Sequence, residues 1–248
     1  MRKGIFLLVS LLILILGLLF FLIYEPQRHI LGYSVYGIDV SRWQEEIDWG
    51  KVKNDRIVFA FMKASQGVDK VDSFFVSNWR ATDSLGIAHG AYHFYEPDKP
   101  PIPQLKNFIS QVKLKPTDLP PVLDLEGVVL KRAEFQQNVQ IWLDSAEVHF
   151  KKKPVIYCSI RYYEAHLKDK FSSYPIWIAQ YKHFPYPKID KSENRGWKIW
   201  QFSQTGKVWG VDGNVDLDVF NGSYEEFLGW KNRTVLSNPT KEKNIEEV

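Results

Sequence analysis

The hydrophobic and polar positions between residues 36 and 220 form short apolar runs separated by longer amphipathic segments. The apolar runs predict eight strands, over residues 35–40, 57–63, 87–94, 121–126, 154–159, 175–181, 198–202 and 215–220. The strongest helix prediction covers residues 132–150, where one face at helical spacing carries Phe135, Val139, Trp142, Leu143 and Ala146. Segments 73–85, 103–112 and 160–170 predict weaker helices.

Alternating strands and helices favour an α/β fold with a mainly parallel sheet. Several of the predicted strands turn polar at their C-terminal ends, which is where a closed (β/α) barrel builds its site. The chain from Tyr36 to Trp230 is short for eight β/α units, so we predict a shortened, TIM-like barrel. A doubly wound open sheet is the alternative, but no Gly-rich phosphate turn follows the first predicted strand.

Residues 4–24 form an uncharged apolar stretch, which predicts one transmembrane helix before the barrel. As a helix it would be about 31 Å long, close to the hydrocarbon thickness of a bilayer. Arg2 and Lys3 precede it, so the positive-inside rule puts the remainder of the chain outside the cytoplasm. A cleaved signal peptide, which would release a secreted protein, is the alternative, although no Ala-x-Ala-like site follows the stretch.

These patterns divide the chain into four parts. We expect a signal-anchor helix in residues 1–24, a linker in 25–35, a catalytic domain in 36–230 and a polar, disordered tail in 231–248. The catalytic domain is expected to act as a monomer on the periplasmic or cell-wall side of the membrane.

Charge and composition exclude several other classes of protein. The net charge of +3 falls to +1 without Arg2 and Lys3, since 30 basic residues then face 29 acidic ones, and this excludes a nucleic-acid footprint. The only cysteine, Cys158, lies in an apolar run and is expected to be a buried core residue rather than part of a disulfide framework. Among the six histidines only His89 and His93 have the His-x-x-x-His spacing, and they lie in a predicted strand rather than on a helix, so we expect neither a metal nor another cofactor.

Asp124 and Glu126, at the end of the fourth predicted strand, are the strongest catalytic candidates. Residues i and i+2 of a strand share a face with Cα atoms about 6–7 Å apart, and two carboxylates at that spacing separate in pKa. Glycosidic cleavage uses such a pair, one as a proton donor and one as an anion beside the oxocarbenium-like centre. The alternative interpretation is a solvated strand end without function.

Other strand ends carry acids and aromatic residues. Asp39 ends the first strand, and Asp216 and Asp218 share one face of the last, although each could instead cap a turn. Aromatic rings near strand ends suit the apolar faces of sugars, and those found here are Trp43, Tyr92, Phe94, Tyr95, Tyr157, Trp177, Tyr181, Trp200 and Trp209. His93 is interpreted as a hydrogen-bonding wall residue.

Eight short motifs occur along the chain in an informative order. Along the chain lie Gly37-Ile38-Asp39-Val40-Ser41-Arg42-Trp43-Gln44, Phe61-Met62-Lys63-Ala64-Ser65, Gly90-Ala91-Tyr92-His93-Phe94, Pro121-Val122-Leu123-Asp124-Leu125-Glu126, Ile156-Tyr157, Trp177-Ile178-Ala179-Gln180-Tyr181, Trp200-Gln201-Phe202 and Val215-Asp216-Leu217-Asp218. In this order they resemble the family 25 glycoside hydrolases, the lysozymes of Chalaropsis and cellosyl type, over roughly residues 36–220.

The resemblance implies a (β/α)5β3 barrel that hydrolyses the β-1,4 bond between N-acetylmuramic acid and N-acetylglucosamine in peptidoglycan. It implies that Glu126 is the general acid and that Asp124 orients or charge-stabilises the 2-acetamido group or the ring centre. Asp39 and Asp216 match two further site acids. The substrate-binding walls of the groove are expected from Tyr92, His93, Tyr157, Trp177, Gln180 and Gln201. Acetamido participation and a direct enzyme nucleophile both stay open at this point.

Two departures from the family pattern keep other functions open. The family often has Lys-Ala-Thr-Glu-Gly at the second strand, whereas this chain has Gln66 in place of the glutamate, and Asp218 stands where Asn is common. Loss of the charge at Gln66 weakens the negative field of the site. The alternatives are therefore a catalytically impaired glycan-binding module and a hydrolase of chitin-like oligomers.

Overall fold

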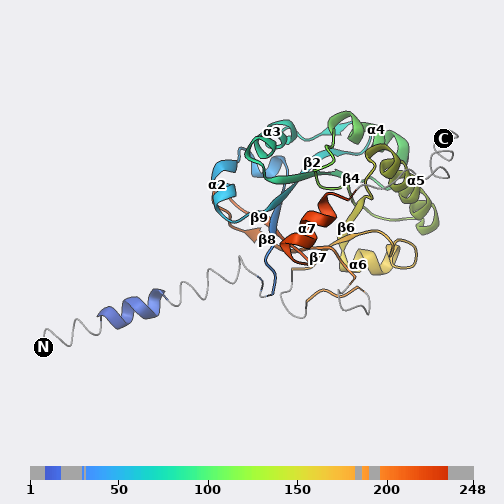
Figure 1. Ribbon diagram of the computed structural model, residues 1–248. Coiled ribbons are helices and arrows are strands. Elements are labelled where there is room, and N and C mark those ends of the chain that lie inside the picture. The colour runs from blue at the N-terminus through green and yellow to red at the C-terminus, as the bar shows by residue number, and fades with distance from the viewer. Residues whose placement is uncertain (1–8, 18–29, 31, 182–185, 190–195, 234–248) are drawn as a thin grey trace, which may run out of the picture.

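Eight strands form a closed ring in a computed structural model that describes residues 9–17, 30, 32–181, 186–189 and 196–233 (Figure 1). The strands of the ring are β1 (Tyr36–Val40), β2 (Phe59–Gln66), β4 (Ala88–Phe94), β5 (Val122–Asp124), β6 (Val155–Ser159), β7 (Ile176–Ala179), β8 (Ile199–Gly206) and β9 (Val215–Phe220). All run parallel except β9, which lies antiparallel between β8 and β1. Because β1 also pairs with β2, the sheet is closed, and the open-sheet alternative is wrong.

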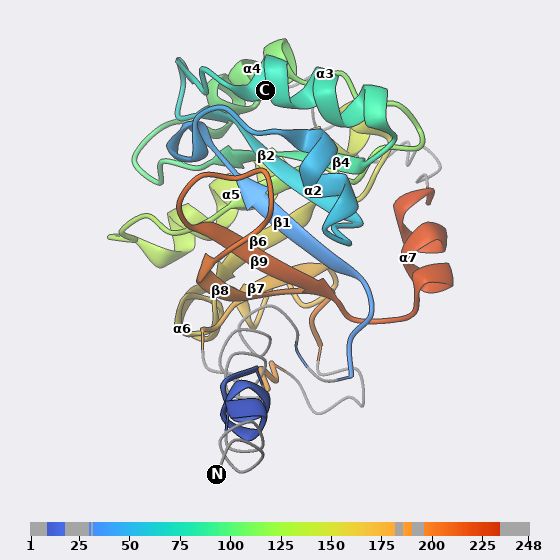
Figure 2. The same ribbon diagram turned by 90° about the vertical axis from the view of Figure 1, so that its left-hand side faces the viewer.

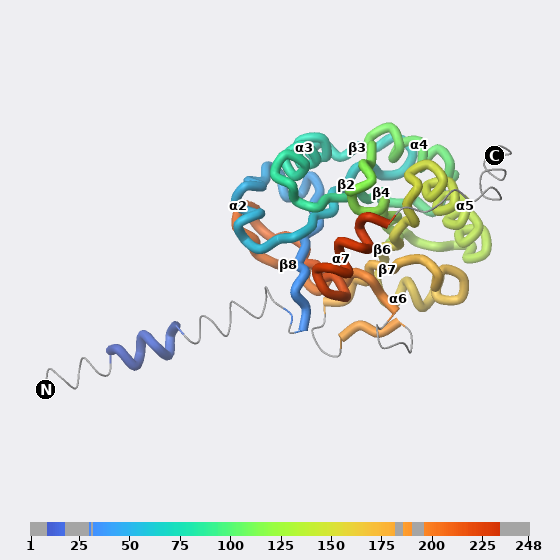
Figure 3. The backbone as a smooth tube through the Cα atoms, viewed as in Figure 1, coloured from blue at the N-terminus to red at the C-terminus, as the bar shows by residue number. Residues whose placement is uncertain are grey.

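Helical segments follow the first five parallel strands and lie outside the ring (Figures 1 and 3). They are α2 (Trp49–Asn54), α3 (Phe75–Leu85), α4 (Pro101–Gln111), α5 (Arg132–Phe150), and α6 (Ile160–Tyr162) with the π-helical turn η3 (Tyr163–Leu167). Between β7, β8 and β9, no helix occurs among the residues that the structure describes there. The predicted barrel of five β/α units and three further strands is confirmed in its architecture.

Three short elements were not predicted from the hydrophobic pattern. The 3-10 turn η2 (Arg42–Gln44) follows β1, and β3 (Lys70–Val71) pairs antiparallel with the end of β2. Helix α7 (Tyr224–Lys231) begins at Ser223, whose side chain and Glu226 form a reciprocal capping box. These elements have two to eight residues, too few for a periodic pattern to be recognised.

Strand alternation divides the buried side chains into two cores. Phe61, Val122 and Trp177 point into the barrel, whereas Leu123, Ile156 and Ile178 on the same strands pack toward the helices. Gly37 is required here, because a side chain at that position would collide with the Phe59 ring inside the barrel.

Helix α7 covers the end of the barrel at which the parallel strands begin (Figure 2). From this helix Phe227 joins the inner core and packs against Phe59 and Phe220, with ring centroids 5.5 and 5.3 Å away. This end is therefore filled with aromatic side chains, and the site must lie at the other end.

The N-terminal prediction is only partly covered by the described residues. Residues 9–17 are helical, and no helix within the described ranges has both the length and the apolar character needed to cross a membrane. The rest of the predicted 4–24 span lies outside those ranges, as do residues 234–248 of the predicted tail. Part of the predicted linker packs on the barrel, because Tyr36 Oη exchanges hydrogen bonds of 3.0 and 2.9 Å with the backbone of buried Ile30.

Candidate active site

A cleft of about 300 Å³ opens at the end of the barrel where the parallel strands finish. It is lined by Asp39, Ser41, Trp43, Lys63, Tyr92, Phe94, Asp124, Glu126, Tyr157, Trp177, Tyr181, Gln201, Gln204 and Asp216. All four acids predicted as catalytic are present, together with four of the six predicted wall residues. They meet because each side chain lies on the inward face near the end of its strand, or just beyond it.

Asp124 and Glu126 share the cleft as their spacing predicts. Asp124 is buried, and its Oδ1 atom has no hydrogen-bond partner, whereas the Glu126 side chain is exposed to the cleft. Burial raises the pKa of Asp124, with the neighbouring Glu126 charge adding to it and the Lys63 ammonium opposing it. Burial also raises the pKa of Glu126, against Lys63 and a hydrogen bond with Tyr157. The pair therefore retains a proton to higher pH than ordinary carboxyls do.

A second group of acids lies across the cleft where β9 closes the barrel. The strand register sets Asp39 opposite Asp216, and Gln201 opposite Asp218. Burial raises the pKa of Asp39 well above its usual range, and the neighbouring carboxyls of Asp216 and Asp218 raise it further. Burial and the Glu126 charge raise the pKa of Asp216 to about 6, despite a hydrogen bond with Asp39. Asp218 lies behind them, fully buried, and accepts a 2.8 Å hydrogen bond from Trp177 Nε1.

Gln201 connects the two groups of acids. Its Nε2 donates a 2.6 Å hydrogen bond to Asp39 Oδ2, and its Oε1 accepts hydrogen bonds from Tyr157 Oη at 2.8 Å and Tyr181 Oη at 2.9 Å. With both phenols donating to Oε1, the amide presents its N–H to Asp39. Tyr181, absent from the predicted wall, is thus part of the site.

Two predicted wall residues are not among those that line the cleft. His93 is fully buried toward the helices, where Nδ1 lies 2.8 Å from Ser65 Oγ and the ring stacks on Trp142 at 6.0 Å. Burial lowers the pKa of His93 to about 4, so the ring is neutral at physiological pH. The physical reason is strand alternation: His93 follows the inward-facing Tyr92, and Gln180 likewise precedes Tyr181. His93 and Gln180 are therefore not among the residues that line the cleft, whereas Tyr181 is.

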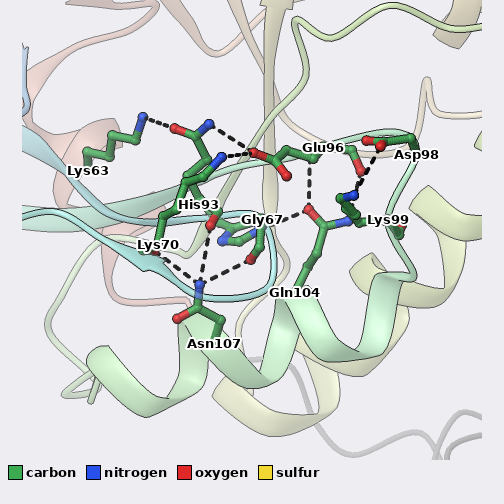
Figure 4. Close-up of polar contacts among 10 residues, drawn as sticks. Lys63, Gly67, Lys70, His93, Glu96, Asp98, Lys99, Gln104 and Asn107 are labelled. Carbon is green, nitrogen blue, oxygen red and sulfur yellow. Dashed lines mark hydrogen bonds and ion pairs between the residues drawn. The ribbon is translucent and has the colours of Figure 1, made fainter.

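Lys63 is a cleft residue that the sequence analysis did not select. Its Nζ donates a 2.8 Å hydrogen bond to Gln66 Oε1 and lies 4.7 Å from the centre of the Phe94 ring. Gln66 Nε2 in turn donates to Glu96 Oε1 at 3.0 Å, which Lys70 Nζ also contacts at 2.7 Å (Figure 4). The sequence did contain a signal for Lys63: it directly follows a run of apolar residues in β2, and strand alternation puts it on the same inward face as Phe61.

An open cleft with a proton-retaining carboxyl pair and exposed aromatic surface defines a class of protein, the barrel glycosidases that work by acid–base chemistry. Trp43 supplies the aromatic surface at the rim, where 77% of its area is exposed. Its neighbour Arg42 lies over the ring, with the guanidinium carbon 5.1 Å from the ring centre.

Comparison with known proteins identifies the family. The model of "Glycosyl hydrolases family 25" matches residues 38–211. Lysozyme M1 of Streptomyces globisporus is 32% identical over 216 residues, which cover 81% of this chain and 72% of that protein. The Escherichia coli protein YegX is 38% identical over 205 residues, covering 80% and 74%. A family 25 glycosyl hydrolase from Bacillus anthracis superimposes with a TM-score of 0.76 at 29% identity, covering 82% of this chain and 96% of that one. The chain belongs to glycosyl hydrolase family 25, so the sequence-based family prediction is confirmed.

Proposed function

We propose that this chain is a peptidoglycan N-acetylmuramidase, which hydrolyses the β-1,4 bond between N-acetylmuramic acid and N-acetylglucosamine. The observation that carries the proposal is the Asp124–Glu126 pair, which combines a buried and an exposed carboxyl in one open cleft. Family membership and the similarity to a lysozyme supply the substrate class.

Glu126 is the general acid in this proposal. It is the member of the pair exposed to the cleft, so it can approach the glycosidic oxygen, and its raised pKa keeps it protonated further toward neutral pH. The Tyr157 hydroxyl, which bonds to Glu126 and Gln201, holds the acid in place before substrate arrives.

Asp124 receives the 2-acetamido group. Its buried Oδ1 atom lacks a partner in the free protein, and an amide N–H of the sugar would satisfy it. That hydrogen bond favours the ionised form of Asp124 and leaves the shared proton on Glu126, as acid catalysis requires. It also turns the acetamido oxygen toward the anomeric carbon, which supports acetamido participation over an enzyme nucleophile.

The acids across the cleft serve the hydrolytic step. Asp39 accepts from Gln201 and is close enough to Asp216 for a hydrogen bond between the two carboxyls. A carboxyl pair with raised pKa values can hold and release a proton near neutral pH, which suits the positioning of the incoming water. Trp43 and Tyr92 present ring surface for the apolar faces of the sugars.

We further propose that residues 4–24 anchor the enzyme in the membrane, with the barrel on its outer side. The uncharged stretch of 21 residues behind Arg2 and Lys3 supports this. Ile30 and Tyr33 pack at the barrel end opposite the cleft, where the Tyr33 ring lies 5.8 Å from Trp197. A tether leaving from that end would turn the cleft away from the membrane and toward the wall.

The test compares the unmodified chain with Glu126→Gln on purified peptidoglycan. Release of reducing ends should fall by at least about 1,000-fold in the variant, because the amide has no acidic proton to donate to the leaving oxygen. Equal rates would end the assignment of Glu126. Binding of soluble muropeptides without cleavage at any pH from about 4 to 8 would favour the glycan-binding module, and preferential cleavage of chitooligosaccharides would favour the chitin-like substrate.

A further inference from the structure

A second cavity of about 440 Å³ opens beside the catalytic cleft, and we call it the side cavity. It lies between the turn after β1 and the β2–β3 hairpin, and its lining residues are Ser41, Arg42, Trp43, Lys63, Gln66, Lys70, Val71 and Asp72. Ser41, Trp43 and Lys63 line both spaces, so the side cavity and the catalytic cleft are direct neighbours.

Basic side chains outnumber acidic ones in the lining of the side cavity. Arg42, Lys63 and Lys70 contribute three cations to its lining, and Asp72 is its single acid. Both Asp72 oxygens are already used, since Oδ2 accepts from the Arg42 backbone N–H at 2.9 Å and Oδ1 from that of Phe74 at 3.0 Å. The acid therefore fixes the backbone of the cavity. Because Lys70 is paired with Glu96 at 2.7 Å, Arg42 and Lys63 are the two lining cations that a ligand would use.

Gln66 preserves this positive charge. It accepts from Lys63 at 2.8 Å and donates to Glu96 at 3.0 Å, so it separates the Lys63 ammonium from the nearest carboxylate of this network (Figure 4). A glutamate at this position would neutralise Lys63 and face Glu96 at close range. Asn107 holds the hairpin in place, since its Nδ2 donates to the carbonyls of Gly67 and Lys70, each at 3.1 Å.

We propose that the side cavity binds an anionic substituent carried by the muramyl residue in the cleft, and so makes the enzyme prefer negatively charged peptidoglycan. This inference rests on the proposed function, because it presumes a muramyl residue at Asp124 and Glu126. The ligand is a carboxylate of the peptide stem or a phosphodiester attached to the same sugar, and both offer anionic oxygens to Arg42 and Lys63. Trp43 stands between the two spaces and orients the sugar that carries the substituent.

Arg42→Gln in the full-length chain tests the proposal. The side chain is exposed, and its bond to Asp72 uses the backbone, so the substitution leaves the fold intact. Arg42→Lys retains the charge, and Lys168→Gln removes an exposed lysine that does not line either cavity. Three soluble glycan strands serve as substrates: one with acidic peptide stems, the same strand with its stem carboxyls amidated, and the amidated strand bearing phosphodiester groups.

For the acidic strand, Arg42→Gln should raise KM about two- to fivefold with kcat unchanged, the effect of one exposed ion pair. Arg42→Lys and Lys168→Gln should stay within about 1.5-fold of the unmodified chain, and high salt should reduce the difference. On the amidated strand Arg42→Gln should have no effect. If Arg42→Gln raises KM only on the strand with phosphodiester groups, and not on the acidic strand, the phosphodiester is the ligand.

Equal KM values for the acidic, amidated and phosphodiester strands in the unmodified chain, or a KM rise with Arg42→Gln that is the same on all three, would overturn the proposal. Equilibrium binding of the same strands to Glu126→Gln, with and without Arg42→Gln, separates it from the proposed function. A charge-dependent preference that persists in binding while the unmodified chain releases no reducing ends would refute the muramidase and keep the side cavity. Absence of any preference in binding would refute the side cavity alone.

Discussion

Asp216→Asn should stabilise the folded protein at neutral and alkaline pH while it impairs the enzyme. The folded state raises the pKa of Asp216 from 3.8 to about 6, because the carboxyl is largely desolvated and faces Glu126. A pKa difference of this size corresponds to about 3 kcal/mol of stability lost when the carboxyl ionises. Asn has nearly the same shape and no charge, so the variant avoids the loss. The carboxyl is partly exposed to solvent, which screens the interaction, and we expect a gain of about 2 kcal/mol at pH 8.

The sign of the pH dependence is specific to a raised pKa. Below about pH 4 the carboxyl is protonated in both the folded and unfolded states, so the variant and the unmodified chain should be equally stable. Between about pH 4 and 6 the unfolded chain ionises first, and the unmodified protein loses stability relative to the variant as the pH rises. Above about pH 6 the difference in stability should be constant.

Urea unfolding followed by tryptophan fluorescence, at pH 4, 5, 6, 7 and 8, measures this difference directly. Asp212→Asn, an exposed acid four residues earlier, is the matched control and should show no pH-dependent difference. A variant that is no more stable than the unmodified chain at pH 8, or a stability difference that does not change with pH, would refute the electrostatic account of this side of the cleft.

Three further substitutions test individual contacts. Gln201→Leu leaves Asp39 without its donor, and we expect urea unfolding at pH 7 to show a loss of about 2–4 kcal/mol with turnover at least about tenfold lower; unchanged turnover would contradict the role of this amide. Trp177→Phe removes the 2.8 Å bond to Asp218 and should cost about 2–3 kcal/mol by the same measurement, whereas a loss below about 0.5 kcal/mol would contradict it. His93→Gln should lower stability by about 1–3 kcal/mol but leave KM within about twofold, and a KM rise above fivefold would return His93 to the substrate groove.

The barrel strands were predictable because both of their faces are buried. A strand covered by helices outside and by side chains inside is mostly apolar, so each predicted run overlaps one of the eight ring strands, although β2 and β8 extend beyond the predicted ends. Helix α5 was predicted with its observed bounds, since its nineteen residues span several turns and give a clear periodic face. The pairing of β1 with β2, which closes the ring, is a long-range contact that left no local signal.

The site was predictable where strand geometry alone decided it. The i, i+2 rule correctly set Asp124 and Glu126 in one cleft. The same rule excludes adjacent residues from sharing a face, and its neglect placed His93 beside Tyr92 in the predicted groove. Lys63 and Gln66 lie three residues apart at the end of β2, so their contact is local. The contact of Gln66 with Glu96 could not be predicted in the same way, because it depends on the pairing of β2 with β4.

Mass analysis of the fragments that the full-length chain releases from purified peptidoglycan tests the proposed muramidase most directly, because it reports turnover and bond choice together. The account predicts disaccharide-peptide fragments that carry N-acetylmuramic acid at a free reducing end, produced by the unmodified chain and absent with Glu126→Gln. Fragments ending in N-acetylglucosamine or in an anhydro sugar, or an undigested wall under conditions where the folded chain binds it, would contradict the account.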